Sequence, residues 1–146
     1  MTCSRELWAA RPLASASPPT AMRCPWSLIT VVALDLGGEV RASASSTDVD
    51  VDDPRSAMVK IAAMVRRLIR DGSVDERQLV GACLALPGPV DPATGAPDSA
   101  VWLPGWARVP LGGILGEQLR MPVPVVKDTL AAVIGENWVR AGESLD

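Results

Sequence analysis

Apolar and polar positions along this chain follow two different periods, and their order predicts an α/β fold. Four segments have the length of strands, 39–45 with alternation and the others as apolar runs: residues 27–34, 39–45, 79–86 and 123–126. Three segments are predicted as helices: residues 54–70, 111–120 and 129–140. The order β-β-α-β-α-β-α predicts a mixed sheet with covering helices.

The segment 54–70 carries the clearest helical pattern. Asp53 can cap this helix, Pro54 suits its first position, and Gly72 can end it. One face is apolar and carries Met58, Ile61, Ala62, Val65, Leu68 and Ile69. Basic side chains lie away from that stripe, at Lys60, Arg66, Arg67 and Arg70. We interpret this basic face as a solvated helix surface, with a binding patch as the alternative.

Residues 1–26 differ from the rest of the chain, because Ala, Ser, Pro and Arg dominate and no period lasts. We expect a disordered tail, since the segment offers no apolar face to bury. The alternative is a non-native segment produced by a misplaced start or a change of reading frame. Under both interpretations, residues 27–146 form the folded unit. Arginines and prolines also interrupt the apolar run that a secretion signal needs.

Composition excludes several classes of function. The chain has 146 residues, 48% of them apolar, and a net charge of −3, so nothing draws it to nucleic acid or anionic membranes. It has three cysteines without CxxC spacing and no histidine, which argues against a zinc site. No apolar run approaches the ~18 residues of a membrane span. Nothing suggests an oxidising compartment, and we expect a cytoplasmic protein.

Two apolar strands end in residues that suit a ligand site. Residues 84–91 read Leu-Ala-Leu-Pro-Gly-Pro-Val-Asp, so a strand runs into a Pro-Gly-Pro corner. Residues 122–128 read Pro-Val-Pro-Val-Val-Lys-Asp, and a helix follows directly. Because α/β sheets bind ligands outside the carboxyl ends of their strands, these two ends predict a crevice.

The order of these segments resembles the ROK family of repressors and sugar kinases. The resemblance covers residues 31–142, and its matching segments are 86–91, 92–95, 103–106, 109–111 and 122–136. It implies an actin-like (ribonuclease-H-like) ATPase lobe, with residues 27–146 as a partial N-terminal lobe. The residues in these segments are most similar to the transcriptional-regulator branch of the family.

Asp128 is the candidate catalytic residue. A carboxylate between a strand and a helix can take a proton from a sugar hydroxyl, or it can simply cap the helix. The resemblance implies the base of a sugar kinase. Its neighbours depart from the family's kinases, because Lys127 replaces an asparagine and Leu130 replaces a second one.

Gly88 and Trp102 are candidate sugar-binding residues, together with Lys127 and Asp128. Gly88 allows a close approach of ligand or backbone, although a plain corner between strand and loop is the alternative. The resemblance places this corner on the sugar side of the cleft. The family's kinases bind sugar through an asparagine where Trp102 stands, and an indole cannot reproduce an amide's donor and acceptor. Trp106 is expected in the core.

Residues Asp35-Leu-Gly-Gly38 invite comparison with the phosphate loop of actin-like kinases. Too little chain follows for the two further strands that such a loop requires before the first helix, and Glu39 would repel a phosphate. We therefore predict a hairpin turn between the second and third strands of the fold. The first strand and its phosphate loop are then expected to be missing, which leaves the residue 28–34 strand at an open edge.

Three functions are consistent with this pattern. The preferred hypothesis is the sugar-kinase-like effector module of a sugar-responsive transcriptional regulator, truncated and inactive alone. The first alternative is an ATP-dependent hexose kinase with Asp128 as base, which would require ATP and magnesium. The second is a binding or assembly module that pairs with another lobe. The partners expected are a sugar or sugar phosphate and further copies of the chain. No cofactor, metal or nucleic acid is expected to bind the chain itself.

Overall fold

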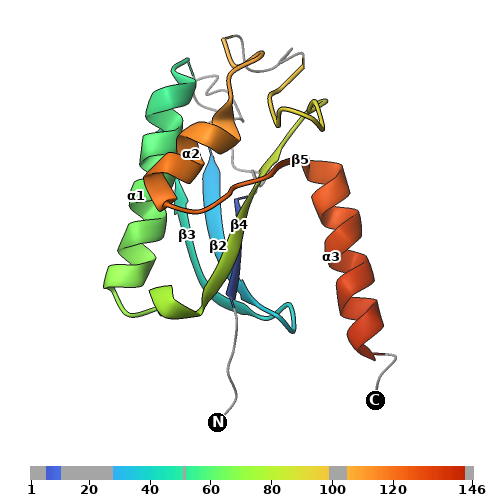
Figure 1. The fold of residues 1–146 in the computed structure, drawn as a ribbon. Coiled ribbons are helices and arrows are strands. Elements are labelled where there is room, and N and C mark those ends of the chain that lie inside the picture. Colours follow the sequence, from blue (N-terminus) through green and yellow to red (C-terminus); the bar gives the residue numbers. More distant parts are fainter. Residues whose placement is uncertain (1–5, 11–27, 51, 99–104, 144–146) are drawn as a thin grey trace, which may run out of the picture.

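A five-stranded mixed sheet forms the centre of the protein (Figure 1). The computed structural model describes residues 6–10, 28–50, 52–98 and 105–143. The strands lie in the order β3-β2-β1-β4-β5. Their bounds are β1 Glu6–Ala10, β2 Ile29–Asp35, β3 Val40–Ser46, β4 Leu79–Leu86 and β5 Val125–Lys127.

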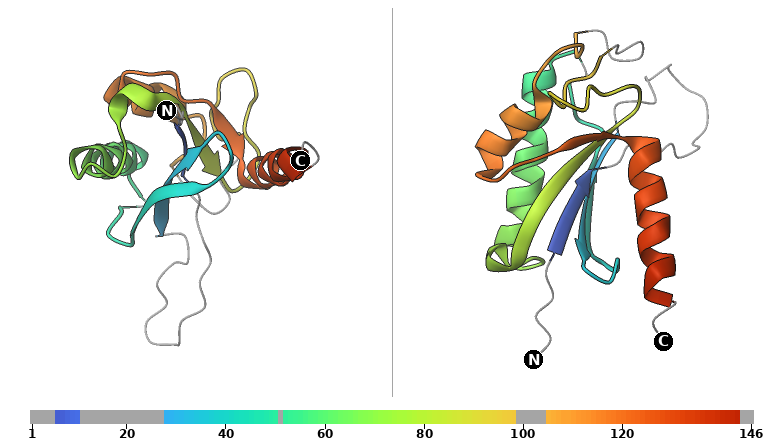
Figure 2. Two further views of the ribbon diagram at one scale, coloured as in Figure 1. Left: turned by 90° about the horizontal axis from the view of Figure 1, so that it is seen from below. Right: turned by 45° about the vertical axis from the view of Figure 1, so that its right-hand side comes forward.

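Helices lie on both sides of this sheet. Helices α1 (Pro54–Arg70) and α2 (Leu111–Leu119) cover one face, and α3 (Asp128–Glu143) lies on the other side (Figure 2). A short 3-10 helix, η2 (Glu76–Gln78), precedes β4. This arrangement confirms the predicted α/β class and the mixed sheet with covering helices.

The direction of the strands separates the two ends of the sheet. β1 is parallel to β4, β4 is parallel to β5, and β2 runs antiparallel to β1. The carboxyl ends of β4 and β5 therefore meet at one edge, where Leu86 pairs with Lys127. Asp35, at the end of β2, pairs with Glu6 at the opposite end of the sheet.

The first strand is the main difference between expectation and structure. Sequence analysis expected no first strand and no fold in residues 1–26, but residues 6–10 form β1 at the centre of the sheet. β1 bonds to β2 on one side and to β4 on the other. A central strand is enclosed on both sides, so its residues need not alternate between apolar and polar. Five residues without this alternation do not indicate a strand. The strand β2 is consequently not an edge.

Helix α1 begins and ends where its capping residues predict. Asp53 Oδ1 accepts a hydrogen bond from the Arg55 backbone N–H at 2.9 Å, and Pro54 occupies the first position. At the other end, Gly72 adopts a φ of 72° and donates its N–H to the carbonyl of Ile69. The predicted apolar stripe faces the sheet.

The hydrophobic core lies between α1, α2 and the face of the sheet that they cover. Met58 and Leu111 are fully buried, and Val31 and Leu84 reach them from β2 and β4. Trp106, expected in the core, is 4% exposed and belongs to the same cluster. This single core fixes β4 and the start of β5 against the helices, and these strands position the candidate site.

Candidate functional site

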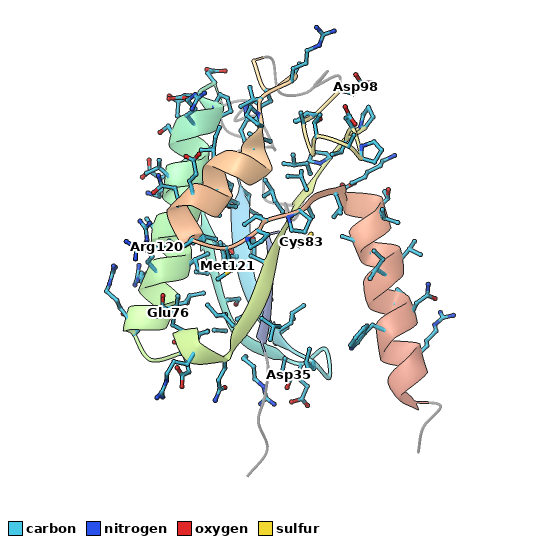
Figure 3. The ribbon with its side chains drawn as sticks, in the orientation of Figure 1. Asp35, Glu76, Cys83, Asp98, Arg120 and Met121 are labelled. Atoms are coloured by element: carbon cyan, nitrogen blue, oxygen red, sulfur yellow. The ribbon has the colours of Figure 1, made fainter. Side chains whose placement is uncertain are left out.

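The carboxyl ends of β4 and β5, where the sequence predicts a crevice, lie side by side. Gly88 follows Leu86 by two residues, and Leu86 pairs with Lys127, the last residue of β5. Asp128 begins α3 directly afterwards. The fold therefore brings the chain around Gly88, Lys127 and Asp128 to one edge of the sheet, as the two strand ends predicted. Figure 3 shows Asp98, from the loop beyond Gly88, near this upper edge, and Asp35 at the lower end.

Asp128 acts as a helix-terminal acceptor in this structure. Its Oδ1 accepts a hydrogen bond from the Thr129 backbone N–H at 2.7 Å, and the residue is half-buried. A carboxylate at this position interacts favourably with the positive end of the α3 dipole. The capping interpretation is consistent with this geometry, and the role of general base stays a prediction.

The neighbours of Asp128 offer charge and apolar surface. The Lys127 side chain is exposed, and none of the ion pairs found among the described residues includes it. Leu130 is 50% exposed, on the first turn of α3. An ammonium group beside Asp128 favours anionic or hydroxylated ligands, whereas Leu130 supplies no hydrogen bond to orient a hydroxyl.

The corner after β4 is a well-defined loop. Gly88 has a φ of 100°, a conformation that favours glycine. Asp91 Oδ1 accepts a hydrogen bond from the Ala93 backbone N–H at 2.8 Å, and this bond is the main reason that the pKa of Asp91 lies below its usual range. Val90 and Pro97 form an antiparallel bridge that closes the loop. The Asp91 carboxylate therefore stabilises the turn at residues 91–95.

Trp102, the remaining candidate for sugar binding, lies outside the described residues. The chain resumes at Gly105 and Trp106, and the Arg108 backbone N–H donates to the carbonyl of Pro97 at 2.8 Å. This bond ties the segment after Trp102 to the loop that follows Gly88. The structure thus assembles Gly88, Lys127 and Asp128 and leaves the role of Trp102 as a prediction.

The turn at Asp35–Gly38 connects the antiparallel strands β2 and β3, as predicted, and lies at the opposite end of the sheet from Asp128. Asp35 accepts backbone hydrogen bonds from Gly37 and Glu39, and its carboxylate forms an ion pair with Arg41. These groups hold the pKa of Asp35 below its ordinary value, with the Glu39 N–H as the largest cause. The Asp35 carboxylate thus serves the hairpin, which argues against a phosphate loop here.

A hydrogen bond joins α3 to this turn, and the sequence did not predict it. The Trp138 indole N–H donates to the backbone carbonyl of Leu36 at 2.7 Å. The two residues are 102 positions apart, and no local pattern signals such a bond. The contact holds the second half of α3 beside the β2–β3 hairpin, although the Trp138 side chain stays 55% exposed.

No group of three or more His, Cys, Asp or Glu side chains suited to a metal ion occurs within the described ranges. Across those same ranges, no helix has the length and hydropathy that crossing a membrane requires.

Three solved structures share this architecture. A ROK hexokinase from Thermus thermophilus superposes with a TM-score of 0.58 at 22% identity, over 69% of this chain and 32% of the hexokinase. An inorganic polyphosphate/ATP-glucomannokinase from Arthrobacter sp. strain KM gives 0.65 at 22% identity, over 79% and 46%. A ROK family transcriptional regulator, a homologue of the E. coli MLC protein, gives 0.54 at 21% identity, over 70% and 26%.

These likenesses establish the fold, which this chain shares with part of ROK-type sugar kinases and of a ROK family regulator, in agreement with the resemblance seen in the sequence. The chain spans less than half the length of each of the three proteins. No protein-family model and no curated protein matches it.

Proposed function

We propose that this chain belongs to the ROK family and is the sugar-responsive effector lobe of a transcriptional regulator, without phosphotransfer activity of its own. The observation that carries the proposal is the distribution of groups over the two ends of the sheet. Gly88, Lys127 and Asp128 share the crevice edge, while the glycine turn at Asp35–Gly38 lies at the other end. These three residues are the groups that we propose for contact with a hydroxylated ligand.

Phosphoryl transfer requires more than a base. The transferred group must be held in line, and its negative charge must be stabilised by backbone N–H groups, cations or metal ions. Within the described residues, the turn that resembles a phosphate loop is occupied by the Asp35 carboxylate and faces away from Asp128. The exposed Leu130 also leaves Asp128 without an amide beside it. Both features favour ligand sensing over catalysis.

We expect no hexose phosphorylation by the chain above background, because the described residues supply a carboxylate but no phosphate-binding loop. A coupled assay with ATP, magnesium and a panel of hexoses measures this directly. Asp128→Asn is the matched variant, since it keeps the size of the side chain and an acceptor for the Thr129 N–H. Turnover that disappears in Asp128→Asn would establish the kinase alternative and overturn the proposal.

The crevice itself is tested by ligand binding. We expect a hexose or hexose phosphate to shift the backbone NMR signals of Gly88, Lys127 and Asp128, because these groups share one edge of the sheet. The absence of any such shift across the hexose panel would contradict the role as a sugar-responsive lobe.

A second candidate function, a module that binds another copy or lobe, is favoured by one face of α3. Four large apolar side chains on this helix are about half exposed: Leu130, Val133, Ile134 and Trp138. Their spacing places them along one side of the helix. A contiguous exposed apolar stripe marks an interaction surface more often than an isolated apolar residue does. The earlier expectation of association through an open β2 edge does not hold, because β2 lies between β1 and β3.

Association through α3 should respond to a single charge. Val133→Lys is expected to lower the apparent mass in light scattering at high protein concentration, because a charge in an apolar contact must be desolvated. Val59→Lys is the control, since Val59 on α1 is 50% exposed and Val133 is 56% exposed. A chain that stays monomeric over the whole concentration series, or two variants with equal effects, would contradict an interface on α3.

A further inference from the structure

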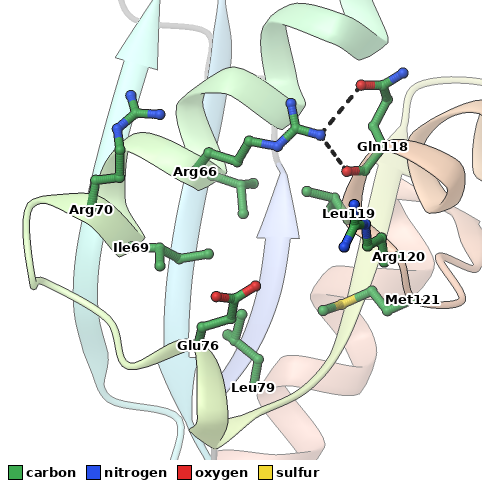
Figure 4. A pocket seen from close by; sticks show the side chains of 10 residues that line it. Arg66, Ile69, Arg70, Glu76, Leu79, Gln118, Leu119, Arg120 and Met121 are labelled. Carbon is green, nitrogen blue, oxygen red and sulfur yellow. Dashed lines mark hydrogen bonds between the residues drawn. The ribbon is translucent and has the colours of Figure 1, made fainter.

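A cavity of about 420 Å³ opens on the opposite side of the molecule from α3 (Figure 4). It lies between the last turns of α1, the 3-10 helix η2, the start of β4 and the carboxyl end of α2. Its volume falls within the range of small-molecule sites in proteins. Because residues 118–121 line it together with residues 65–79, which are distant from them in sequence, only the folded chain forms it.

The cavity has an apolar lining on which a ligand can pack. Val65 is buried, and the half-buried side chains around it are Ile69, Leu79, Leu119 and Met121. Such a surface suits the C–H face of an organic molecule better than a bare inorganic ion.

Charged side chains surround this lining. Arg66 donates from Nη2 to the backbone carbonyl of Gln118 at 2.5 Å, which ties the carboxyl end of α2 to α1. Arg70 and Arg120 also line the cavity, as does Glu76. Figure 4 shows the Glu76 carboxylate between Ile69 and Met121, with Arg120 beside Leu119.

Three of these charged groups are available to a ligand. None of the hydrogen bonds or ion pairs found in the described part of the chain involves the Arg70, Glu76 or Arg120 side chain. Two neighbouring arginines do have carboxylate partners: Arg67 pairs with Asp71, and Arg77 pairs with Asp75. The charges of Arg70, Glu76 and Arg120 differ in this respect from those two pairs.

The cavity is separate from the crevice. Leu79 lines it at the first residue of β4, whereas the crevice begins beyond Leu86 at the last residue of that strand. Seven residue steps of an extended strand span about 23 Å, so one small ligand cannot occupy both places.

Arg66 and Arg70 belong to the basic face of α1, which the sequence analysis interpreted as a solvated surface. Arg120 lies at the end of α2, so that interpretation does not explain its position. Arg120 ends α2 with a φ of 58°, a position where glycine or asparagine is usual. A third arginine thus lines the cavity from a different element than Arg66 and Arg70. Guanidinium groups are the side chains that best match phosphate and carboxylate oxygens.

We propose that this cavity is a binding site for a small organic anion that carries hydroxyl groups, such as a sugar phosphate. The arginines bind the anionic group, the Glu76 carboxylate accepts hydrogen bonds from hydroxyls, and the apolar lining packs against the carbon skeleton. Inorganic phosphate binds more weakly, since it lacks the skeleton and meets the repulsion of Glu76. The site is independent of the function proposed for the crevice.

An NMR titration of the full ¹⁵N-labelled chain tests the site, with glucose 6-phosphate, inorganic phosphate and glucose as separate probes. Glucose 6-phosphate is expected to shift the backbone signals of residues 66–70 and 118–121, with a Kd of about 1 mM, because the charged groups are exposed. Inorganic phosphate is expected to bind at least about fivefold more weakly, and glucose to cause no shift there.

Two variants separate a built site from general charge attraction. Arg120→Asn removes the charge and keeps a residue that tolerates positive φ, and it is expected to weaken glucose 6-phosphate binding by about fivefold or more. Arg108→Asn is the matched control, since Arg108 is exposed, has a φ of 62° and lies outside the cavity. Glu76→Gln is expected to strengthen inorganic phosphate binding and reduce the preference for glucose 6-phosphate. If Arg120→Asn misfolds, Arg70→Gln replaces it.

Three results overturn the proposal. The first is an absence of shifts at residues 66–70 and 118–121 at about 20 mM glucose 6-phosphate, well above the expected Kd. The second is equal weakening by Arg120→Asn and Arg108→Asn, which would indicate attraction to net charge alone. The third is a set of shifts confined to Gly88, Lys127 and Asp128, which would place the compound in the crevice.

Discussion

Replacing Gly112 with alanine is expected to destabilise the protein by about 3 kcal/mol, at the upper end of the usual cost of overpacking. A Cβ on this residue would lie 2.4 Å from the Val123 carbonyl oxygen and 3.1 Å from Val125 Cγ2. The first neighbour is backbone and cannot rotate away. Helix α2 would have to move from the segment that leads into β5, so Leu111 would lose its buried position. Chemical denaturation, read as the change in midpoint, measures the loss.

The adjacent glycine provides the matched control. A Cβ at Gly113 would meet only Pro110 Cβ, at 3.9 Å, which is an ordinary contact. Alanine is a better helix former than glycine, so Gly113→Ala is expected to stabilise the protein by about 0.5–1 kcal/mol. The same substitution at two neighbouring positions should thus change stability in opposite directions. Equal effects would contradict the close contact of α2 with residues 123–125.

Much of this fold could be predicted because its signals are local. Asp53, Pro54 and Gly72 mark the ends of α1, and its apolar stripe gives the side that faces the sheet. The apolar run at 79–86 matches the bounds of β4. Each of these features depends on residues a few positions apart, which is the range over which capping and periodicity act.

The shared edge of β4 and β5 could be predicted from the same local logic, and the cavity could not. Strand ends that carry Gly88 and Asp128 indicate a shared edge once the two strands are taken as parallel neighbours. The cavity instead has Arg120, at the end of α2, in its lining together with Arg66 and Arg70 of α1. That arrangement is set by the packing of two helices far apart in sequence, and the basic residues of α1 alone favoured a solvated face, with a binding patch as the alternative.

The sequence did not predict β1, for a different reason. Its five residues are too few to display a period, and prolines and serines follow them in the sequence. Its strand character comes from its neighbours, since β2 and β4 each present a row of backbone groups that a strand between them can satisfy. The place of β1 in the order β3-β2-β1-β4-β5 was therefore a tertiary property.

Ala9→Pro is expected to have the second large effect, a loss of about 3–5 kcal/mol of stability. Ala9 pairs with Val32 of β2 on one side and with Cys83 of β4 on the other. Proline has no backbone N–H, and its ring does not fit a strand enclosed on both sides. A domain normally has a net stability of only about 5–15 kcal/mol, so the variant is expected to melt far below the parent chain or not to fold.

Ala9→Gly is the control for this change, because it alters the same side chain and keeps the backbone N–H. It is expected to cost only about 0.5–1 kcal/mol, the entropy of ordering a glycine in a strand. Thermal unfolding followed by circular dichroism distinguishes the two variants. If residues 1–26 carried no fold, both substitutions would leave the melting temperature unchanged. A large loss in Ala9→Pro with a small one in Ala9→Gly requires β1 to bond to both neighbours, which makes residues 6–10 part of the sheet that positions Gly88, Lys127 and Asp128.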